Sequence, residues 1–310
     1  MSNFRAQQKS NQRKTFLLLG VMGSLTAFVF YAFALYLGYT SIGVIPIVVG
    51  ISMVGVWGSY YSSDKIVLSM TGAKVIDHDT APQLFNLVNE ITIASGLPMP
   101  KVAIVEDDAP NAFATGRDPE HAVIAFTTGI LRVMDREQLQ GVAAHELAHV
   151  ANRDTLVSAV AATTAGAIAL MSDFLLRITM FGGGRRDNNG GSNPLVLIAA
   201  LIAALLAPIA AVLLKAAISR KREALADATA VAFTRNPTGL RRALETLAAD
   251  STVVHQKSNA VAHLWIESPL DNKLTSKLFA THPAIEDRIA NLRALEQSGP
   301  VPGSAPNTSD

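Results

Sequence analysis

The sequence predicts an α+β protein that is also a multi-pass helical membrane protein. Three features of the 310-residue chain lead to this prediction: an uncharged apolar stretch near the N-terminus, a central region that alternates β-type segments with helical patterns, and a second apolar region that interrupts this pattern. The chain then divides into an N-terminal segment with two transmembrane helices (1–63), the first half of a globular domain (64–152), a membrane hairpin (153–218), the second half of the domain (219–296) and a disordered tail (297–310).

The N-terminal segment begins with basic residues and continues as an apolar stretch. Residues 1–14 contain four basic residues and no acidic ones, and no charged residue occurs from Thr15 to Ser63. Because a membrane helix needs about 20 apolar residues, this stretch holds two, at about 16–37 and 42–61. A cleaved signal peptide is the alternative, but its apolar region would be much shorter. The basic residues place the N-terminus, and therefore the chain after the second helix, in the cytoplasm.

The next part of the chain has the composition of a globular domain. Short runs of β-branched and apolar residues predict strands at 66–70, 73–76, 101–105, 111–116 and 122–127. Apolar residues at helical spacing predict a helix from 81 to 95, which Gly96 ends. Asp135 and Gln138 have the spacing of a capping box, so a further helix is expected to begin there.

A membrane hairpin is expected between the two halves of the domain. Apolar runs from Leu156 to Ser172 and from Pro194 to Leu214 flank a Gly-rich turn. The alternative is a pair of buried helices in a soluble bundle. Helical patterns resume at 238–249 and 284–295, and the Gly, Pro and Ser content of the C-terminal tail predicts disorder.

The helix that begins after Asp135 carries the sequence His145-Glu146-Leu147-Ala148-His149. At about 3.6 residues per turn, both histidines lie on one helix face and can bind the same zinc ion. Glu146 follows the first histidine, where its carboxylate can act as a general base toward a water molecule. The motif is short enough to arise by chance, in which case the histidines would be merely packed or solvated.

A third zinc ligand must come from elsewhere, because catalytic zinc sites usually have three protein ligands. The chain has no cysteine, which excludes thiolate ligands, thiol catalysis and disulfides. Glu223, shortly after the hairpin, is the candidate. Asp227, one helical turn later, can hold a zinc-binding histidine through a hydrogen bond. The alternative is a surface helix whose acidic residues face solvent.

Composition also bears on the partners of the protein. A net charge of +1 argues against the basic surface that nucleic-acid binding requires, so no nucleic acid is expected. The predicted membrane helices imply contact with the lipid bilayer. The oligomeric state cannot be inferred from the sequence.

In combination, these motifs resemble those of the HtpX-like membrane zinc metalloproteases, which are related to the CAAX prenyl proteases. Besides the His145 motif, Glu223 and Asp227, the resemblance covers Asn152-Arg153-Asp154, Ser219-Arg220-x-Arg222, the stretches 111–116 and 263–270, Thr281-His282-Pro283 and Arg288-Ile289. One departure is Ala224, where relatives usually carry an aromatic residue, and it should alter only the local packing.

The resemblance implies a zincin-like domain with a small mixed sheet and zinc-dependent endopeptidase activity. One Zn2+ per chain would be bound by His145, His149 and Glu223, with Glu146 as the general base and Asp227 behind a ligand. The residues Asn111, Ala112, Phe113 and Ala114 would form the edge strand to which an extended substrate adds. His282 would stabilise the oxyanion.

The resemblance also implies substrates and a location. The substrates would be membrane proteins or peptides, including misfolded membrane proteins in stress-response quality control. The protein would lie in the cytoplasmic (inner) membrane with its catalytic domain facing the cytoplasm. Two alternatives stay open: a CAAX-type protease that acts on modified substrates, and a catalytically silent membrane scaffold with a structural metal site.

Overall fold

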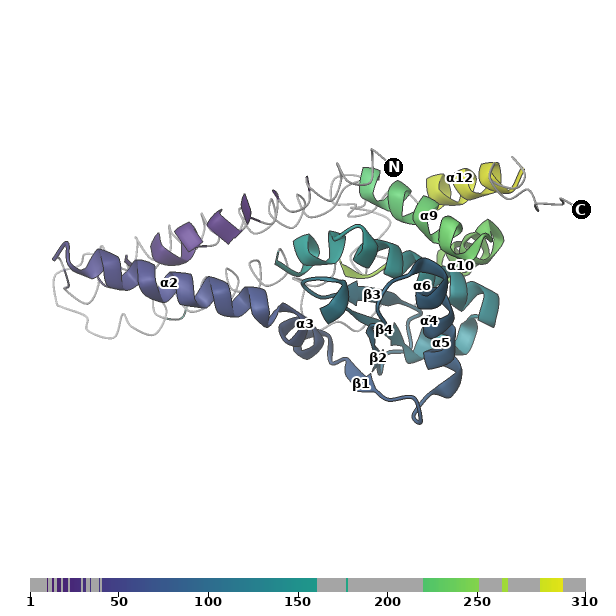
Figure 1. Ribbon diagram of the computed structural model, residues 1–310, viewed down its shortest axis with the longest axis horizontal. Helices are drawn as coiled ribbons and strands as arrows, with labels where there is room; N and C mark the ends of the chain where they lie inside the picture. Colours follow the sequence, from purple (N-terminus) through teal and green to yellow (C-terminus); the bar gives the residue numbers. More distant parts are fainter. Residues whose placement is uncertain are drawn as a thin grey trace, which may run out of the picture.

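The computed structural model describes residues 41–160, 220–250, 264–266 and 285–297, together with Arg177 and single residues or short runs between 10 and 39. Figure 1 shows helices gathered around a small sheet, with the helix α2 (Val44–Tyr61) projecting away from them. The predicted mixture of helix and sheet is therefore confirmed. Parts of the first predicted membrane span, most of the predicted hairpin, His282 and the tail after Gln297 lie outside the described residues.

The sheet is mixed, as the family resemblance implies, and it has four of the five predicted strands. Its strands are β1 (Lys74–Ile76), β2 (Lys101–Val105), β3 (Ala112–Thr115) and β4 (Val123–Thr127), in the order β1-β2-β4-β3. The two central strands β2 and β4 are parallel, whereas β1 and β3 pair with them antiparallel. The short helix η1 (Pro119–His121) lies between β3 and β4 in the chain. The topology leaves β3 at one edge of the sheet.

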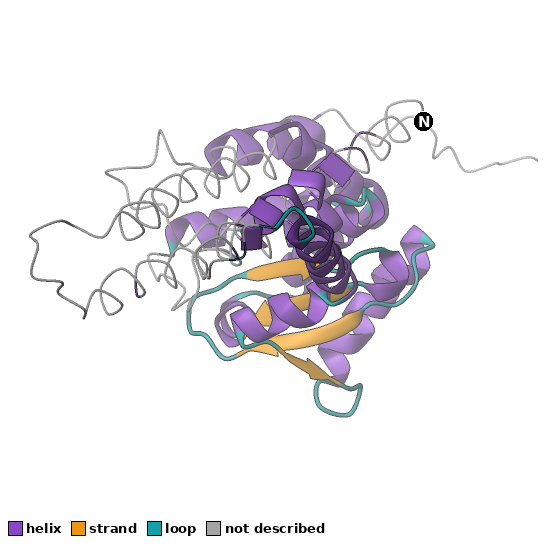
Figure 2. Ribbon diagram, turned by 90° about the vertical axis from the view of Figure 1, so that its left-hand side faces the viewer, coloured by secondary structure: helices purple, strands orange, loops and turns teal. Residues whose placement is uncertain are grey.

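Helices cover one face of the sheet and form the larger core. The helices α4 (Pro82–Ser95) and α6 (Arg136–Ala151) pack there, with the short helix α5 (Thr128–Val133) between them in the chain. Apolar side chains at helical spacing on α4 and α6, among them Leu87 and Leu147, are buried against Ile124 and Phe126 of β4. Figure 2 shows helices packed beside the strands of the sheet. The sequence predicts α4 with nearly the observed bounds and the start of α6, and it does not predict α5.

The predicted strand at 66–70 is wrong. These residues belong to the helix α3 (Ser63–Thr71), which Gly72 ends in a left-handed conformation at φ 71°. The buried side chain of Val67 packs on the second face of the sheet, in a smaller core that also contains Phe113 and Trp265. A short apolar run suits either a strand or a buried helical turn, and here this tertiary packing decides for the helix.

The helix α2 is apolar and largely exposed. Its exposed apolar side chains include Ile47, Ile51, Val54 and Trp57. Within the described residues, no single helix has the length and apolarity to cross a bilayer, whereas α2 up to Gly58 and α3 meet these requirements together, with a 69° bend between them. The second predicted span, at 42–61, thus coincides closely with α2.

The remaining helices are α9 (Arg220–Thr234), α10 (Pro237–Ala249) and α12 (Ile285–Gln297). The helix α10 crosses α6 at two glycines, where the backbones are in close contact. A Cβ atom on Gly141 would lie 2.4 Å from the backbone nitrogen of Leu240, and one on Gly239 would lie 2.6 Å from the carbonyl oxygen of Glu137. Only glycine permits this approach, which fixes α6 relative to the second half of the domain.

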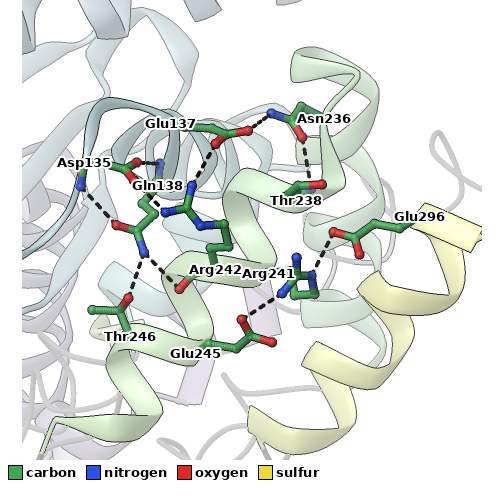
Figure 3. A network of polar contacts seen from close by, with 10 residues as sticks. All are labelled: Asp135, Glu137, Gln138, Asn236, Thr238, Arg241, Arg242, Glu245, Thr246 and Glu296. Atoms are coloured by element: carbon green, nitrogen blue, oxygen red, sulfur yellow. Dashed lines mark hydrogen bonds and ion pairs between the residues drawn. The ribbon is translucent and has the colours of Figure 1, made fainter.

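Polar contacts hold the start of α6 against α10 (Figure 3). The predicted capping box is confirmed, because Asp135 accepts the N–H of Gln138 and Gln138 accepts the N–H of Asp135. The Gln138 amide also donates to the carbonyl oxygen of Arg242 at 3.1 Å and to the hydroxyl of Thr246 at 2.7 Å. The Arg242 guanidinium donates to Asp135 at 2.8 Å and to Glu137 at 2.9 Å. The helix that bears the metal motif is therefore fixed at its first turn.

Candidate metal centre

The two histidines of the motif lie on the same face of α6. Their ring centroids are 4.7 Å apart, and the Nε2 atoms of His145 and His149 are 3.2 Å apart. His145 is 1% exposed, whereas His149 is less deeply buried. The i, i+4 spacing on a capped, well-packed helix thus brings two possible ligand atoms to one point.

Glu223 brings a third possible ligand atom from α9. Its carboxylate oxygens lie 3.6 Å from Nε2 of His145 and 3.7 Å from Nε2 of His149. One atom from each of the three residues fits within 4.8 Å, a set that can hold a metal ion. Glu223 and Asp227 are each only 6% exposed, so they are not the solvated surface acids of the alternative interpretation.

A carboxylate lies behind each histidine. Asp227 Oδ1 is 2.9 Å from Nδ1 of His145, and Asp154 Oδ2 is 3.2 Å from Nδ1 of His149. This pattern assigns the proton of each neutral ring to Nδ1, so each Nε2 carries a lone pair. Two unprotonated Nε2 atoms that face one another at 3.2 Å repel each other unless a proton or a metal ion lies between them. The donor set and its tautomers therefore fit a metal ion.

Arg288 on α12 fixes the first of these carboxylates. Its guanidinium donates from Nε to Asp227 Oδ2 at 3.0 Å and from Nη2 to Asp227 Oδ1 at 2.7 Å. A third nitrogen, Nη1, lies 3.7 Å from Glu223. Arg288 is 3% exposed, so the planar, bidentate pair is closed off from solvent. The C-terminal helix thus contributes a positioning residue to the site.

Burial and charge shift the pKa values of the site residues in the metal-free protein. Burial raises the pKa of Glu146 above its usual range, which makes its carboxylate a stronger base than one at the surface. Burial opposes ionisation of Asp227, but the charge of Arg288 and the hydrogen bond with His145 hold its pKa at about 2. Burial and Arg288 lower the pKa of His145, yet its hydrogen bonds with Asp227 and Glu223 raise it to about 9.

Comparison with known proteins identifies the family to which a chain with this site belongs. Residues 78–296, which include all the residues of the centre, match the profile of peptidase family M48. The chain is 46% identical over 240 residues to the protease HtpX homolog of Syntrophobacter fumaroxidans, covering 77% of this chain and 85% of that relative. It is 41% identical over 292 residues to the homolog of Thermoanaerobacter pseudethanolicus, covering 93% of this chain and 96% of that relative.

The chain belongs to peptidase family M48. It is a metalloendopeptidase, as the sequence predicts. Among solved structures, that of S. mikatae Ste24p shares the fold, with a TM-score of 0.51 at 16% identity, covering 94% of this chain and 67% of that chain. This match supports the fold of the chain, and the metalloprotease assignment comes from the family match.

Two positioning residues of this M48 site are missed by the sequence analysis. Asp154 and Arg288 lie in stretches that carry the family resemblance, yet no role follows from their spacing. Asp154 comes directly after Arg153, whose φ of 57° interrupts the helical path between α6 and the helical residues 154–160. This break lets Asp154 turn back toward His149.

The other predicted site residues are His282 and the four residues of the proposed substrate strand. His282 is outside the described residues, so its role stays a prediction. Ala112, Phe113 and Ala114 belong to the edge strand β3, which packs beside α6, and Asn111 directly precedes it. A second cluster of possible ligands, on Asp118, Glu120 and His121, is exposed or half-buried on η1 and lies apart from the M48 motif.

Proposed function

We propose that the protein is a zinc-dependent endopeptidase of the cytoplasmic membrane that cleaves membrane proteins, including misfolded ones, at the cytoplasmic face. The observation that carries this proposal is the convergence of His145, His149 and Glu223 beside the buried carboxylate of Glu146. Two imidazoles and one carboxylate form a ligand set typical of catalytic zinc, with a coordination position left for water. We propose one Zn2+ per chain.

The side chains around the metal divide the work of hydrolysis. Bound in this site, zinc supplies a Lewis acid that polarises the peptide carbonyl and acidifies water. Glu146 takes a proton from the attacking water and delivers it to the leaving amine. Asp227 and Asp154 hold the two imidazoles in the orientation that presents Nε2 to the metal. Arg288 holds Asp227 in turn, and His282 is proposed to stabilise the oxyanion.

The edge strand β3 is the proposed binding site for the substrate backbone. An extended peptide that adds to β3 would form main-chain hydrogen bonds independent of its sequence. Because α6 packs against β3, such a peptide would lie beside the helix that carries His145 and Glu146. This mode of binding suits an endopeptidase that acts on many unfolded segments.

The exposed apolar helix α2 supports a membrane location. A row of apolar side chains including Ile47, Ile51 and Val54 is unfavourable when exposed to water and favourable in contact with lipid. The basic N-terminal residues favour a cytoplasmic N-terminus, and the second span then returns the chain to the cytoplasm. A reporter fused after Asp64 should report cytoplasm, and a periplasmic result would contradict this orientation.

Loss and return of the metal tests the proposed activity. Full-length protein in detergent should cleave casein, lose this activity on dialysis against a chelator, and regain it with one equivalent of zinc. Cleavage that persists in metal-free protein, or that needs two zinc ions per chain, would contradict the proposal.

A CAAX-type protease is the second candidate, favoured by the fold shared with Ste24p. Prenylated and unmodified forms of one peptide separate the two candidates. The proposed function predicts cleavage of the unmodified peptide, whereas cleavage that requires the prenyl group would favour the alternative. A catalytically silent scaffold would cleave neither form.

A further inference from the structure

The outer edge of β3 is already paired with another segment of the chain. The N–H of Thr127 donates to the carbonyl oxygen of Asn111 at 2.9 Å, so Asn111 faces β4. Main-chain groups alternate in direction along an antiparallel strand, so those of Ala112 and Ala114 point away from β4. The N–H of Ile266 donates to the outward carbonyl oxygen of Ala112 at 3.0 Å. The outward N–H of Ala112 donates to the Asn111 side chain at 3.0 Å. Both outward groups of Ala112 are therefore in use.

The paired segment, Leu264–Ile266, is anchored on both sides of the sheet. Trp265 is 1% exposed and its ring meets the ring of Phe113 edge to face, with the centroids 4.8 Å apart. Leu264 lies in the same core, whereas Ile266, at 5% exposed, belongs to the core on the α6 side. Removing the segment from β3 would expose all three apolar side chains together, which indicates a fixed part of the fold.

The position of Ala114 differs from that of Ala112. Among the described residues, none forms a hydrogen bond with the outward groups of Ala114. It lies two residues further along the same edge, and its side chain belongs to the core that contains the apolar residues of α6. A peptide that adds to this edge therefore finds main-chain partners at Ala114 and none at Ala112.

We propose that Leu264–Ile266 is a fixed end-stop, a segment that limits how far a bound substrate strand can extend along the outer edge of β3. A bound peptide pairs with Ala114, and its strand cannot continue past Ile266 toward Ala112. The enzyme then recognises substrate backbone over a limited length at one end, and Ile266 is a residue that determines specificity. This inference rests on the proposed function, in which β3 binds the substrate.

A peptide-length series tests the end-stop with the zinc-loaded full chain. Quenched fluorescent peptides are built around a casein cleavage site mapped by mass spectrometry, and each end is lengthened one residue at a time. For the parent, kcat/KM should reach a plateau after fewer added residues at one end of the peptide than at the other. Ile266→Pro lacks the N–H donor, and its ring carbon takes the place of the hydrogen that meets the Ala112 carbonyl oxygen, so the segment is forced away from Ala112. In this variant two further residues at that end should raise kcat/KM about 3- to 10-fold, the effect of one additional hydrogen bond.

The matched control is Ile266→Ala, which shortens the buried side chain but keeps the N–H. It should retain the plateau of the parent. Equal gains at both ends for the parent, or an unchanged plateau in a zinc-binding Ile266→Pro variant, would overturn the inference.

Hydrogen exchange decides the question if Ile266→Pro does not fold. The amide of Ile266 should be protected in Glu146→Gln protein, and it should stay protected when the longest peptide is added. Loss of protection on adding the peptide would show that the segment is displaced, and would overturn the end-stop. A parent protein that cleaves nothing would instead refute the proposed function. The exchange of Ile266 in that protein would still report whether the segment is fixed.

Discussion

The carboxylate of Asp227 lies 2.9 Å from Nδ1 of His145 and receives two hydrogen bonds from Arg288. One oxygen, Oδ1, serves both partners, so a residue of the C-terminal helix α12 controls a histidine of α6 through a single acid. Zinc affinity should therefore depend on side chains that never contact the metal.

Replacing Asp227 by Asn tests this dependence. The amide keeps the shape of the side chain but removes the charge that orients the imidazole and neutralises Arg288. Zinc affinity, measured by competition with a chelator, should fall roughly 10- to 100-fold. The control Asp79→Asn changes an acid whose side chain is 99% exposed and should leave the affinity unchanged. Equal affinity for Asp227→Asn and the parent would contradict the assigned role.

Arg288→Gln should reduce both stability and zinc affinity. Removing one partner of a buried ion pair leaves the other charge uncompensated, at a cost of about 3–5 kcal/mol. Arg293→Gln on the same helix is the control, since its bridge to Glu245 at 2.7 Å is exposed and is worth about 1 kcal/mol or less. Thermal unfolding of the zinc-loaded proteins gives the stability loss of each variant, and competition with a chelator gives its zinc affinity. A similar loss for the two variants would mean that Arg288 has no special role.

Gly141→Ala should destabilise the protein although alanine is the better helix former. Helix propensity favours alanine by about 1 kcal/mol, but the new Cβ would lie 2.4 Å from the backbone nitrogen of Leu240. Separating α6 from α10 costs about 1–3 kcal/mol or more, so the clash outweighs the propensity. Gly58→Ala in α2, where nothing lies within 4 Å of the new atom, should cause no such loss. A more stable Gly141→Ala variant would disprove the close crossing.

The charge of Asp135 should stabilise the fold only above acidic pH. The backbone N–H of Gln138 is the main cause that lowers the pKa of Asp135, and Arg242 adds to it. A folded-state pKa below the unfolded value means that the stabilisation is complete above the unfolded pKa, near 4, and is lost as pH falls through the lower folded value.

Asp135→Asn isolates this charge, since asparagine is an equally good N-cap. The melting temperature of the parent should exceed that of the variant at pH 6, and the gap should shrink as the pH falls below about 4. A gap in melting temperature that stays constant or widens toward acid pH would contradict a lowered folded-state pKa of Asp135.

Local patterns predict the parts of this protein that depend on neighbouring residues. The capping box at Asp135 and the i, i+4 histidines of α6 follow from spacing alone. The roles of Asp154 and Arg288 and the pairing of Ile266 with Ala112 do not, because these contacts form only when distant segments pack together. The error at 66–70 has the same origin, since packing of Val67 on the sheet decides its conformation.

The most direct test of the account compares Glu146→Gln with the parent. Bound zinc per chain and the rate of casein cleavage are measured on the same samples of full-length protein. Because Glu146 is proposed to move the proton and not to bind the metal, the variant should keep one zinc per chain. It should cleave casein about 100- to 10,000-fold more slowly. A variant that binds zinc and cleaves casein as fast as the parent would contradict the proposed mechanism.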